Sequence, residues 1–246
     1  MKWFFNLFSR LFSKKKIVKE EPIKIEPKKE EVVEEKPEPT EEEKKKETIK
    51  SVADDIIKTK KEQDRDLFNK TLPLILKYEG GYVNDPHDPG GETNKGIIKT
   101  TYDAYRKGKG LPIVSVREIT DDEIDDIYYN EYWLRGSCDK LFDNLAIIHF
   151  DSCVNTGIKQ SAKFLQRSCG VTDDGAIGIN TLKAVATTDK KEMIEKYLKN
   201  RRDFYHFLVD KKPTSKKFLK GWLKRVAHLE EHINDRNIDE NITAMV

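Results

Sequence analysis

Apolar residues recur at helical spacing from about residue 64 to residue 233, and this pattern predicts a mainly α-helical fold. The first helix of this region is expected to end at Gly80, acting as a left-handed stop. Alternating apolar and polar positions occur only in short runs, so little strand is predicted, with a small hairpin allowed between residues 80 and 98. Further helices are predicted over residues 100–107, from 120 onward, and over 145–154, 161–168, 180–186, 191–209 and 215–233.

Two of these helices carry distinctive local signals. The sequence from Thr120 to Glu123 is a capping box, which predicts the start of a helix. Residues 145–154 are strongly apolar and are expected to form a central buried helix. Asp151 and Asn155 lie four apart on one face of it. They either line a cleft or belong to a hydrogen-bonded buried network, and both alternatives stay open.

The first 61 residues lack this pattern, and we expect a disordered N-terminal arm. Residues 1–16 combine an aromatic, apolar run with a lysine cluster, which is typical of an interfacial helix on an anionic membrane surface. A sticky tail or a docking peptide for a partner protein is the alternative. The run is too short to span a membrane and lacks a signal-peptide cleavage site. Residues 17–61, rich in Lys, Glu and Pro, predict an extended linker that turns helical from about Glu41.

Charge and cysteine content argue against several classes of function. The chain has 46 basic and 44 acidic residues and a net charge of +2, so the whole-chain charge does not indicate a nucleic-acid-binding protein. Cys138, Cys153 and Cys169 include no CxxC pair. We therefore expect buried free thiols, not a disulfide framework or a zinc ribbon. We also expect a monomer with no metal and no cofactor.

The segment from Tyr78 to Ile97 is dense in Gly, Pro, Asn and acidic residues, which suits a functional loop on a helical scaffold. Glu79 is predicted in the last turn of the preceding helix, where the macrodipole disfavours a carboxylate. Partial burial would also favour its neutral form. A carboxylic acid that stays protonated near neutral pH is what a general acid requires. The alternative is an exposed glutamate beside a helix cap.

Asp88 and Thr93 follow Glu79 in the same loop. A glycosidase needs one protonated carboxyl group and a second group that positions water or stabilises positive charge. Glu79 and Asp88 can face each other across a cleft, and Thr93 can orient the water. The alternative for Asp88 is a turn-forming role ahead of Pro89.

These residues resemble the signature of a known family. The stretches 78–82, 88–91 and 93–97 are similar to glycoside hydrolase family 108 muramidases, which include phage endolysins and secretion-associated peptidoglycan hydrolases. The resemblance implies a lysozyme-like helical fold. It also implies that Glu79 is the catalytic acid, because Glu79 matches the family's Glu-Gly-Gly-Tyr motif. The spacing of Glu79, Asp88 and Thr93 is similar to the triad of phage-type lysozymes, with the second gap one residue shorter.

The second half resembles the family's following predicted peptidoglycan-binding region, in the stretches 132–133, 150–157, 165–166, 174–178 and 221–225. The resemblance spans roughly residues 65–230. The expected organisation is a basic amphipathic segment (1–16), a linker (17–61), a lysozyme-like catalytic region (62–136), a helical peptidoglycan-binding region packed with it as one unit (137–236) and a tail (237–246).

The resemblance implies an N-acetylmuramidase that cleaves the β-1,4 bond of peptidoglycan in the periplasm or cell wall. The residues expected to contact the glycan are Tyr82, Asn94, Tyr128, Asp151 and Asn155. A lytic transglycosylase and a non-catalytic peptidoglycan-binding or assembly protein are the alternatives. Because no export signal is recognisable, we expect release by a holin, a secretion apparatus or a phage particle.

One motif indicates a different chemistry. The sequence from His228 to His232 matches the H-x-x-E-H pattern of a class of zinc peptidases. Two histidines four apart can bind zinc, but a further acidic ligand is required. Leu229 and Ile233 fit an ordinary amphipathic helix, which is the interpretation we favour.

Overall fold

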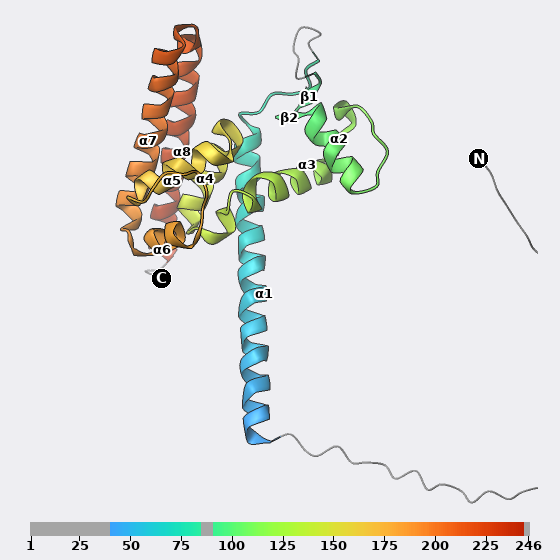
Figure 1. Ribbon diagram of the computed structural model, residues 1–246, viewed down its shortest axis with the longest axis vertical. Helices are drawn as coiled ribbons and strands as arrows, with labels where there is room; N and C mark the ends of the chain where they lie inside the picture. The colour runs from blue at the N-terminus through green and yellow to red at the C-terminus, as the bar shows by residue number, and fades with distance from the viewer. Residues whose placement is uncertain (1–39, 85–90, 244–246) are drawn as a thin grey trace, which may run out of the picture. The chain divides into compact units, whose positions relative to one another are not determined.

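The computed structural model describes residues 40–84 and 91–243 (Figure 1). The expectations for residues 1–39 and for Asp88 therefore lie outside the described residues. Two compact units are distinguished, residues 1–49 and 50–246. In the first unit only the start of one helix is described, and the packing reported below belongs to the second.

Helix α1 (Glu41–Leu76) begins where the linker was predicted to turn helical, which confirms that prediction. Thr40 and Glu43 cap it reciprocally: the Glu43 N–H donates to Thr40 Oγ1 at 3.3 Å, and the Thr40 N–H donates to the Glu43 carboxylate at 2.7 Å. Residues 41–63 are exposed. Burial begins further along, at Leu67 and Phe68.

The helix ends at Leu76, so the predicted end at Gly80 was wrong. The N–H groups of Tyr78 and Glu79 donate to the carbonyls of Ile75 and Leu76, three residues back, at 3.0 and 3.2 Å. This is a tighter pattern than that of an α-helix, and it closes the helix in a turn. Gly80 does not have a positive φ, so it is not the left-handed stop that the sequence suggested.

The C-terminal half of α1 packs into an aromatic core. Phe68 lies edge-on to Tyr129 and Trp133, with ring centroids 5.0 and 5.6 Å apart, and its ring is 5.5 Å from that of Phe150. Tyr129 and Trp133 belong to η2 (Tyr129–Leu134), a π-helical segment, and Phe150 belongs to α4 (Asp143–Thr156). Asp64 accepts hydrogen bonds from the Tyr129 hydroxyl and the Trp133 indole. These contacts fix the C-terminal half of α1 against η2 and α4.

A short hairpin follows the loop. Strands β1 (Thr93–Asn94) and β2 (Ile97–Ile98) pair antiparallel, which confirms the hairpin predicted between residues 80 and 98. The two turn residues, Lys95 and Gly96, have positive φ values of 45° and 77°. Two-residue hairpin turns favour this backbone twist. Next come α2 (Lys99–Gly108) and η1 (Val116–Glu118).

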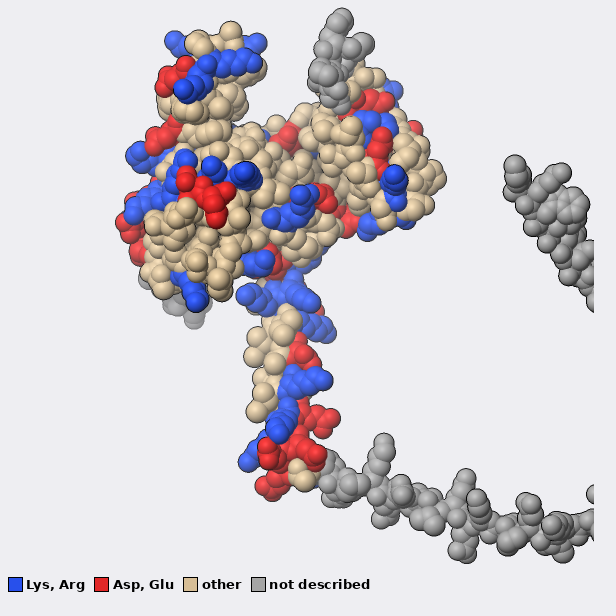
Figure 2. All heavy atoms as spheres, in the orientation of Figure 1, with Lys and Arg blue, Asp and Glu red and all other residues tan. Residues whose placement is uncertain are grey.

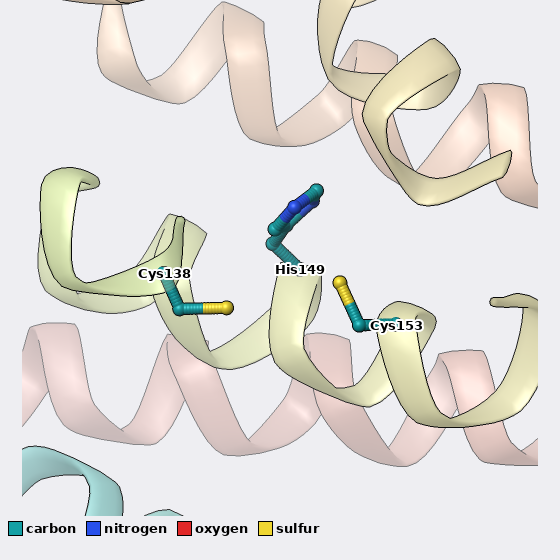
Figure 3. A group of neighbouring side chains, drawn as sticks. All are labelled: Cys138, His149 and Cys153. Carbon is teal, nitrogen blue, oxygen red and sulfur yellow. The ribbon is translucent and has the colours of Figure 1, made fainter. Parts of the chain in front are cut away.

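Helix α3 (Asp121–Tyr128) begins at the predicted capping box. The Glu123 N–H donates to Thr120 Oγ1 at 3.2 Å, and the Thr120 N–H donates to the Glu123 carboxylate at 3.0 Å. The helix continues directly into η2, which leaves Tyr128 buried in its last turn. After η2, η3 (Cys138–Lys140) brings Cys138 beside His149 and Cys153 of α4 (Figure 3).

Helix α4 is the central buried helix that the sequence predicted, because every residue from Asn144 to Cys153 is buried. Helices α5 (Ile158–Ser168) and α7 (Lys190–Lys211) pack on it, and α8 (Lys216–Thr243) runs beside α7 (Figure 1). Between them lie α6 (Ile179–Thr187) and η4 (Pro213–Ser215). Within the described residues the chain is mainly α-helical with one small hairpin, and the predicted fold class is confirmed.

Charged side chains of both signs are interspersed over the face drawn in Figure 2. Along α1, Lys46 pairs with Glu42 at 2.9 Å and Lys70 pairs with Asp66 at 2.6 Å, each pair one helical turn apart. Among the helices described, none combines the length and the apolar character that crossing a membrane requires.

Candidate active site

Glu79 lies in the turn after α1, beside the tip of the β1–β2 hairpin, and its side chain is 18% exposed. A Cβ built on Gly96, in that tip, would lie 2.8 Å from Glu79 Oε2 and 2.7 Å from the hydroxyl oxygen of Tyr128. Cβ atoms do not approach other atoms this closely. The hairpin backbone therefore reaches the carboxylate only because residue 96 is a glycine.

Tyr128 supports the hairpin tip from the other side. Its hydroxyl donates to the Lys95 carbonyl at 2.8 Å and so ties α3 to the turn. Burial raises the pKa of Tyr128, and the charge of Glu79 raises it further. The same two causes raise the pKa of Tyr132, whose ring stacks on that of Tyr128 with centroids 5.3 Å apart. Both phenols therefore stay neutral at physiological pH, and Tyr128 acts as a fixed hydrogen-bond donor.

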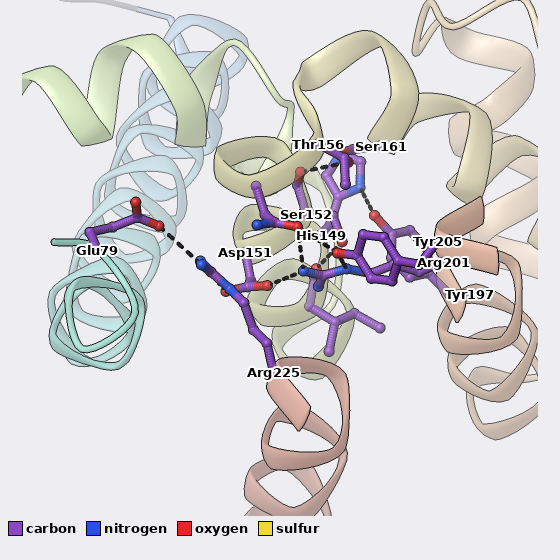
Figure 4. A network of polar contacts seen from close by, with 12 residues as sticks. Glu79, His149, Asp151, Ser152, Thr156, Ser161, Tyr197, Arg201, Tyr205 and Arg225 are labelled. Carbon is purple, nitrogen blue, oxygen red and sulfur yellow. Dashed lines mark hydrogen bonds and ion pairs between the residues drawn. The ribbon is translucent and has the colours of Figure 1, made fainter. Parts of the chain in front are cut away.

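The second oxygen of Glu79 is held by a distant arginine. Arg225 of α8 donates from Nη1 to Glu79 Oε1 at 3.1 Å (Figure 4). The ring of Tyr78 covers the guanidinium, with Arg225 Cζ 4.8 Å from the ring centroid. The sequence argument considered only burial and the helix end, and it did not include this arginine.

Arg225 is in turn held by Asp151 of α4. Its Nε donates to Asp151 Oδ1 at 2.8 Å, and its Nη2 lies 2.7 Å from the same oxygen. The other oxygen of Asp151 pairs with Arg201 of α7 at 2.6 Å. Asp151 and Arg201 are both fully buried, so Asp151 does not line an open cleft. Of the two alternatives that the sequence left open for Asp151, this geometry matches the buried network.

The network continues to Asn155 and Tyr205. Arg201 Nε donates to the Tyr205 hydroxyl at 2.8 Å, and Asn155 Oδ1 accepts from both Tyr205 and Arg201. Asn155 is half-buried, and its carbonyl oxygen already has these two donors. Its contact with a glycan stays a prediction.

Two further predicted residues lie in the hairpin. Thr93 forms a backbone bridge with Val83, in which each N–H donates to the other residue's carbonyl at 2.8 and 2.9 Å. The side-chain amide of Asn94 donates to the Val116 carbonyl at 3.2 Å and so connects β1 to η1. Both residues therefore support the fold around Glu79, and their roles toward substrate stay predictions.

Tyr82 lies between Glu79 and the hairpin in the sequence. The guanidinium of Arg117 sits over its ring, 4.3 Å from the centroid. Asp88 lies outside the described residues. Direct roles for Tyr82 and Asp88 in binding or catalysis therefore stay predictions.

Sequence reasoning missed Arg225 and Arg201. Each lies on an otherwise buried helix face: Arg225 is one turn before Leu229 in α8, and Arg201 is one turn after Tyr197 in α7. A buried charge must be paired, so an arginine at an apolar position signals an acidic partner inside the core. Asp151, within the strongly apolar α4, is the complementary signal.

Cys138, His149 and Cys153 form a separate buried cluster, with one ligand atom from each lying within 4.8 Å of the others. Both ring nitrogens of His149 already have partners: Nδ1 contacts the Tyr197 hydroxyl at 2.9 Å, and Nε2 contacts the Gly136 carbonyl at 3.0 Å. Because a carbonyl can only accept, Nε2 carries a proton and donates it to the Gly136 carbonyl. We interpret the cluster as a hydrogen-bonded part of the core. All three thiols are free; Cys138 and Cys153 are buried, as the sequence predicted, but Cys169 is only half-buried.

The residues of the alternative zinc motif do not come together as a metal site. The Tyr78 hydroxyl forms a hydrogen bond with Nδ1 of His228. Burial, followed by the charge of Arg236, lowers the pKa of His232. Among the described residues, the side chains close enough together to hold a metal ion are those of the cysteine–histidine cluster. This cluster includes neither His228 nor His232. The amphipathic-helix interpretation fits this arrangement.

Comparisons with known proteins show two family matches along the chain and one similar solved structure. The family described as glycosyl hydrolase 108 matches residues 72–157, and the family described as predicted peptidoglycan domain matches residues 160–227. Among solved structures, the chain is similar to Brucella abortus SagA at 33% sequence identity and a TM-score of 0.56, over 67% of this chain and 92% of that chain. No curated protein matches the chain.

The polar network joins the two matched regions. Glu79 and Asp151 lie in the first, and Arg201 and Arg225 lie in the second. The likeness to SagA covers nearly all of that chain, at an identity that indicates common descent. The chain therefore belongs to the glycosyl hydrolase 108 family, and it is a glycoside hydrolase that acts on peptidoglycan at the cell wall.

Proposed function

We propose that the protein is an N-acetylmuramidase that cleaves the β-1,4 glycosidic bond of peptidoglycan, with Glu79 as the general acid. The position of the Glu79 carboxylate carries the proposal. One oxygen accepts from Arg225, and the other lies against the hairpin tip at Gly96. The carboxylate is largely shielded yet keeps an exposed edge. A partly buried carboxyl group with one oxygen anchored suits protonation of a glycosidic oxygen.

The two oxygens of Glu79 would have different tasks. A neutral carboxyl group carries one O–H and still accepts hydrogen bonds at its other oxygen. With Oε1 accepting from Arg225, the proton belongs on Oε2. Its transfer to the glycosidic oxygen breaks the bond to the anomeric carbon, where positive charge develops and water then adds. Asp88 and Thr93 are proposed to position this water or to stabilise the positive charge.

Turbidity loss of purified cell walls tests the role of Glu79. The variant Glu79→Gln keeps the shape and an acceptor oxygen for Arg225 but cannot supply an acidic proton. We expect its initial rate to fall by about 100- to 10,000-fold, with binding to insoluble peptidoglycan retained. Glu118→Gln, which changes an exposed glutamate of η1, is the control and should keep the full rate. A fully active Glu79→Gln would overturn the assignment.

We further propose that residues 62–136 and 137–236 act as one packed unit in a monomeric enzyme, since Arg225 reaches Glu79 across them. Residues 1–16 are proposed to hold the enzyme at an anionic membrane surface, on the basis of their aromatic and lysine content. The full chain should then bind anionic vesicles in a salt-sensitive way. A chain starting at residue 60 should not bind them, and equal binding by both chains would exclude this role.

A further inference from the structure

Arg225 occupies a position where a cation is unfavourable without partners. It lies on the apolar face of α8, between Trp222 and Leu229, and its side chain is only 7% exposed. A buried charge must be paired and hydrogen-bonded. Arg225 is paired with two carboxylates: Nη1 donates to Glu79 and Nε donates to Asp151, while Nη2 makes an ion-pair contact with Asp151 without a hydrogen bond.

The partners form a row of alternating charges from the turn after α1 to the core. Glu79, Arg225, Asp151 and Arg201 follow one another, with nitrogen–oxygen separations of 3.1, 2.7 and 2.6 Å (Figure 4). The last three residues belong to α8, α4 and α7, whereas Glu79 lies in a turn. The packed helices therefore fix Arg225, and Arg225 fixes one oxygen of Glu79.

We infer that Arg225 is a positioning residue for Glu79, so that helix α8, from the region that follows the glycosidase match, completes the active site. The inference rests on the proposed role of Glu79 as the acid. The inference gives the C-terminal region a role in the chemical step, in addition to any role in binding peptidoglycan.

Two physical effects follow from the contact. Nη1 of Arg225 engages Oε1, which leaves Oε2 as the oxygen that carries the proton. As that proton leaves, a full negative charge forms on the carboxylate, 3.1 Å from a guanidinium that is already in place. A preorganised charge of this kind stabilises the transition state without further rearrangement. Because both effects act on the chemical step, we expect kcat to depend on Arg225 and KM to be nearly independent of it.

Steady-state kinetics of the full chain on purified peptidoglycan test the inference. Arg225→Met removes the charge and the hydrogen bonds while keeping much of the volume. We expect its kcat to fall at least about tenfold and its KM to stay within about twofold. Arg225→Lys keeps the charge but lacks the planar, forked guanidinium that reaches both carboxylates. Its kcat should therefore lie between that of Arg225→Met and that of the wild type. Asp151→Asn removes one of the two carboxylates that hold Arg225 and should also lower kcat.

Arg202→Met is the matched control. Arg202 of α7 pairs with Glu230 of α8, so this change also breaks an arginine–glutamate pair between packed helices. No contact connects Arg202 with Glu79 among the described residues. The kcat of the Arg202→Met variant should therefore equal that of the wild type. Circular dichroism of each variant gives the folded fraction at the assay temperature. If Arg225→Met does not fold, folded Arg225→Lys decides: a lowered kcat supports the inference, and an unchanged kcat overturns it.

A wild-type kcat in folded Arg225→Met would also overturn the inference. The inference would also be overturned if Arg225→Met and Arg202→Met lost equal activity in proportion to their folded fractions. Arg225 would then have a purely structural role. Failure of the proposed function gives a different result, namely full activity of Glu79→Gln. An inactive Glu79→Gln beside a fully active Arg225→Met would keep Glu79 as the acid and reject only the role of Arg225.

Discussion

Arg225 Nη1 lies 3.1 Å from Glu79 Oε1, across 146 positions of the sequence. The contact joins the region matched by the glycosyl hydrolase 108 family to the region matched by the predicted peptidoglycan domain. The second region therefore contributes directly to the surroundings of the proposed acid. Changes on either side of this contact should affect the rate of glycan cleavage.

Replacing Gly96 by alanine is predicted to disturb the carboxylate of Glu79. The added Cβ would lie 2.8 Å from Glu79 Oε2, so the side chain must move. We expect kcat on purified peptidoglycan to fall at least about tenfold. The positive φ of residue 96 is also unfavourable for alanine and should reduce the free energy of unfolding by about 1–2 kcal/mol, measurable by urea denaturation.

Gly110→Ala separates these two effects. Gly110 lies outside the loop that carries the proposed catalytic residues and has a φ of 69°, but a Cβ there would meet nothing within 4 Å. This variant should lose a similar amount of stability and keep the wild-type kcat. If both alanine variants lose kcat equally, the close approach of Gly96 to Glu79 is not what matters for activity.

Glu123 is predicted to make stability depend on pH in the acid range. Burial acts to raise the pKa of Glu123, but hydrogen bonds from Thr120 and Tyr102 and the charge of Arg106 outweigh it and lower the pKa below 4.5. The unfolded chain then binds the proton more readily, so this stabilisation is present above the unfolded pKa and is lost as pH falls through the folded pKa. Between about pH 5 and about pH 3, urea unfolding of Glu123→Gln should therefore show a smaller loss of stability than the wild type.

The control for this pH dependence is Glu118→Gln, at an exposed glutamate of η1. Its loss of stability on acidification should match that of the wild type. A Glu123→Gln variant that loses as much stability as the wild type would show that other carboxyl groups account for the effect.

The three thiols are predicted to differ in reactivity. Cys138 and Cys153 are buried, whereas Cys169 is partly exposed. Burial raises the pKa of Cys169, which reduces its reactive thiolate form, whereas burial itself keeps a reagent away from Cys138 and Cys153. An aromatic disulfide reagent should therefore modify only Cys169 in the folded protein, slowly, and all three cysteines after unfolding. Rapid modification of folded Cys169→Ser would contradict the buried placement of the other two.

Most helices could be predicted because their signals are local. The capping box at Thr120 involves residues three apart, and the apolar run at 145–154 gives α4 its central place without knowledge of its neighbours. The hairpin follows from a turn-rich segment that ends in a glycine with positive φ. In each case the residues that determine the structure are adjacent in the sequence.

The partners of Glu79 could not be predicted in the same way. Helical periodicity shows that Arg225 lies on an apolar face, but not that this face meets the turn after α1. The predicted helix end at Gly80 was wrong because the last backbone hydrogen bonds tighten after Leu76, and composition does not reveal this change. The π-helical η2, which directly follows Tyr128, also has no simple sequence pattern.

Analysis of the reaction products tests the central claim most directly. Purified peptidoglycan is digested with the wild type or with Glu79→Gln, reduced with borohydride and examined by mass spectrometry. If Glu79 is the acid of a muramidase, the wild type releases fragments that end in reduced muramic acid, at a rate at least about 100-fold above that of Glu79→Gln. Fragments ending in anhydro-muramic acid or in reduced glucosamine, or equal release by Glu79→Gln, would contradict the account.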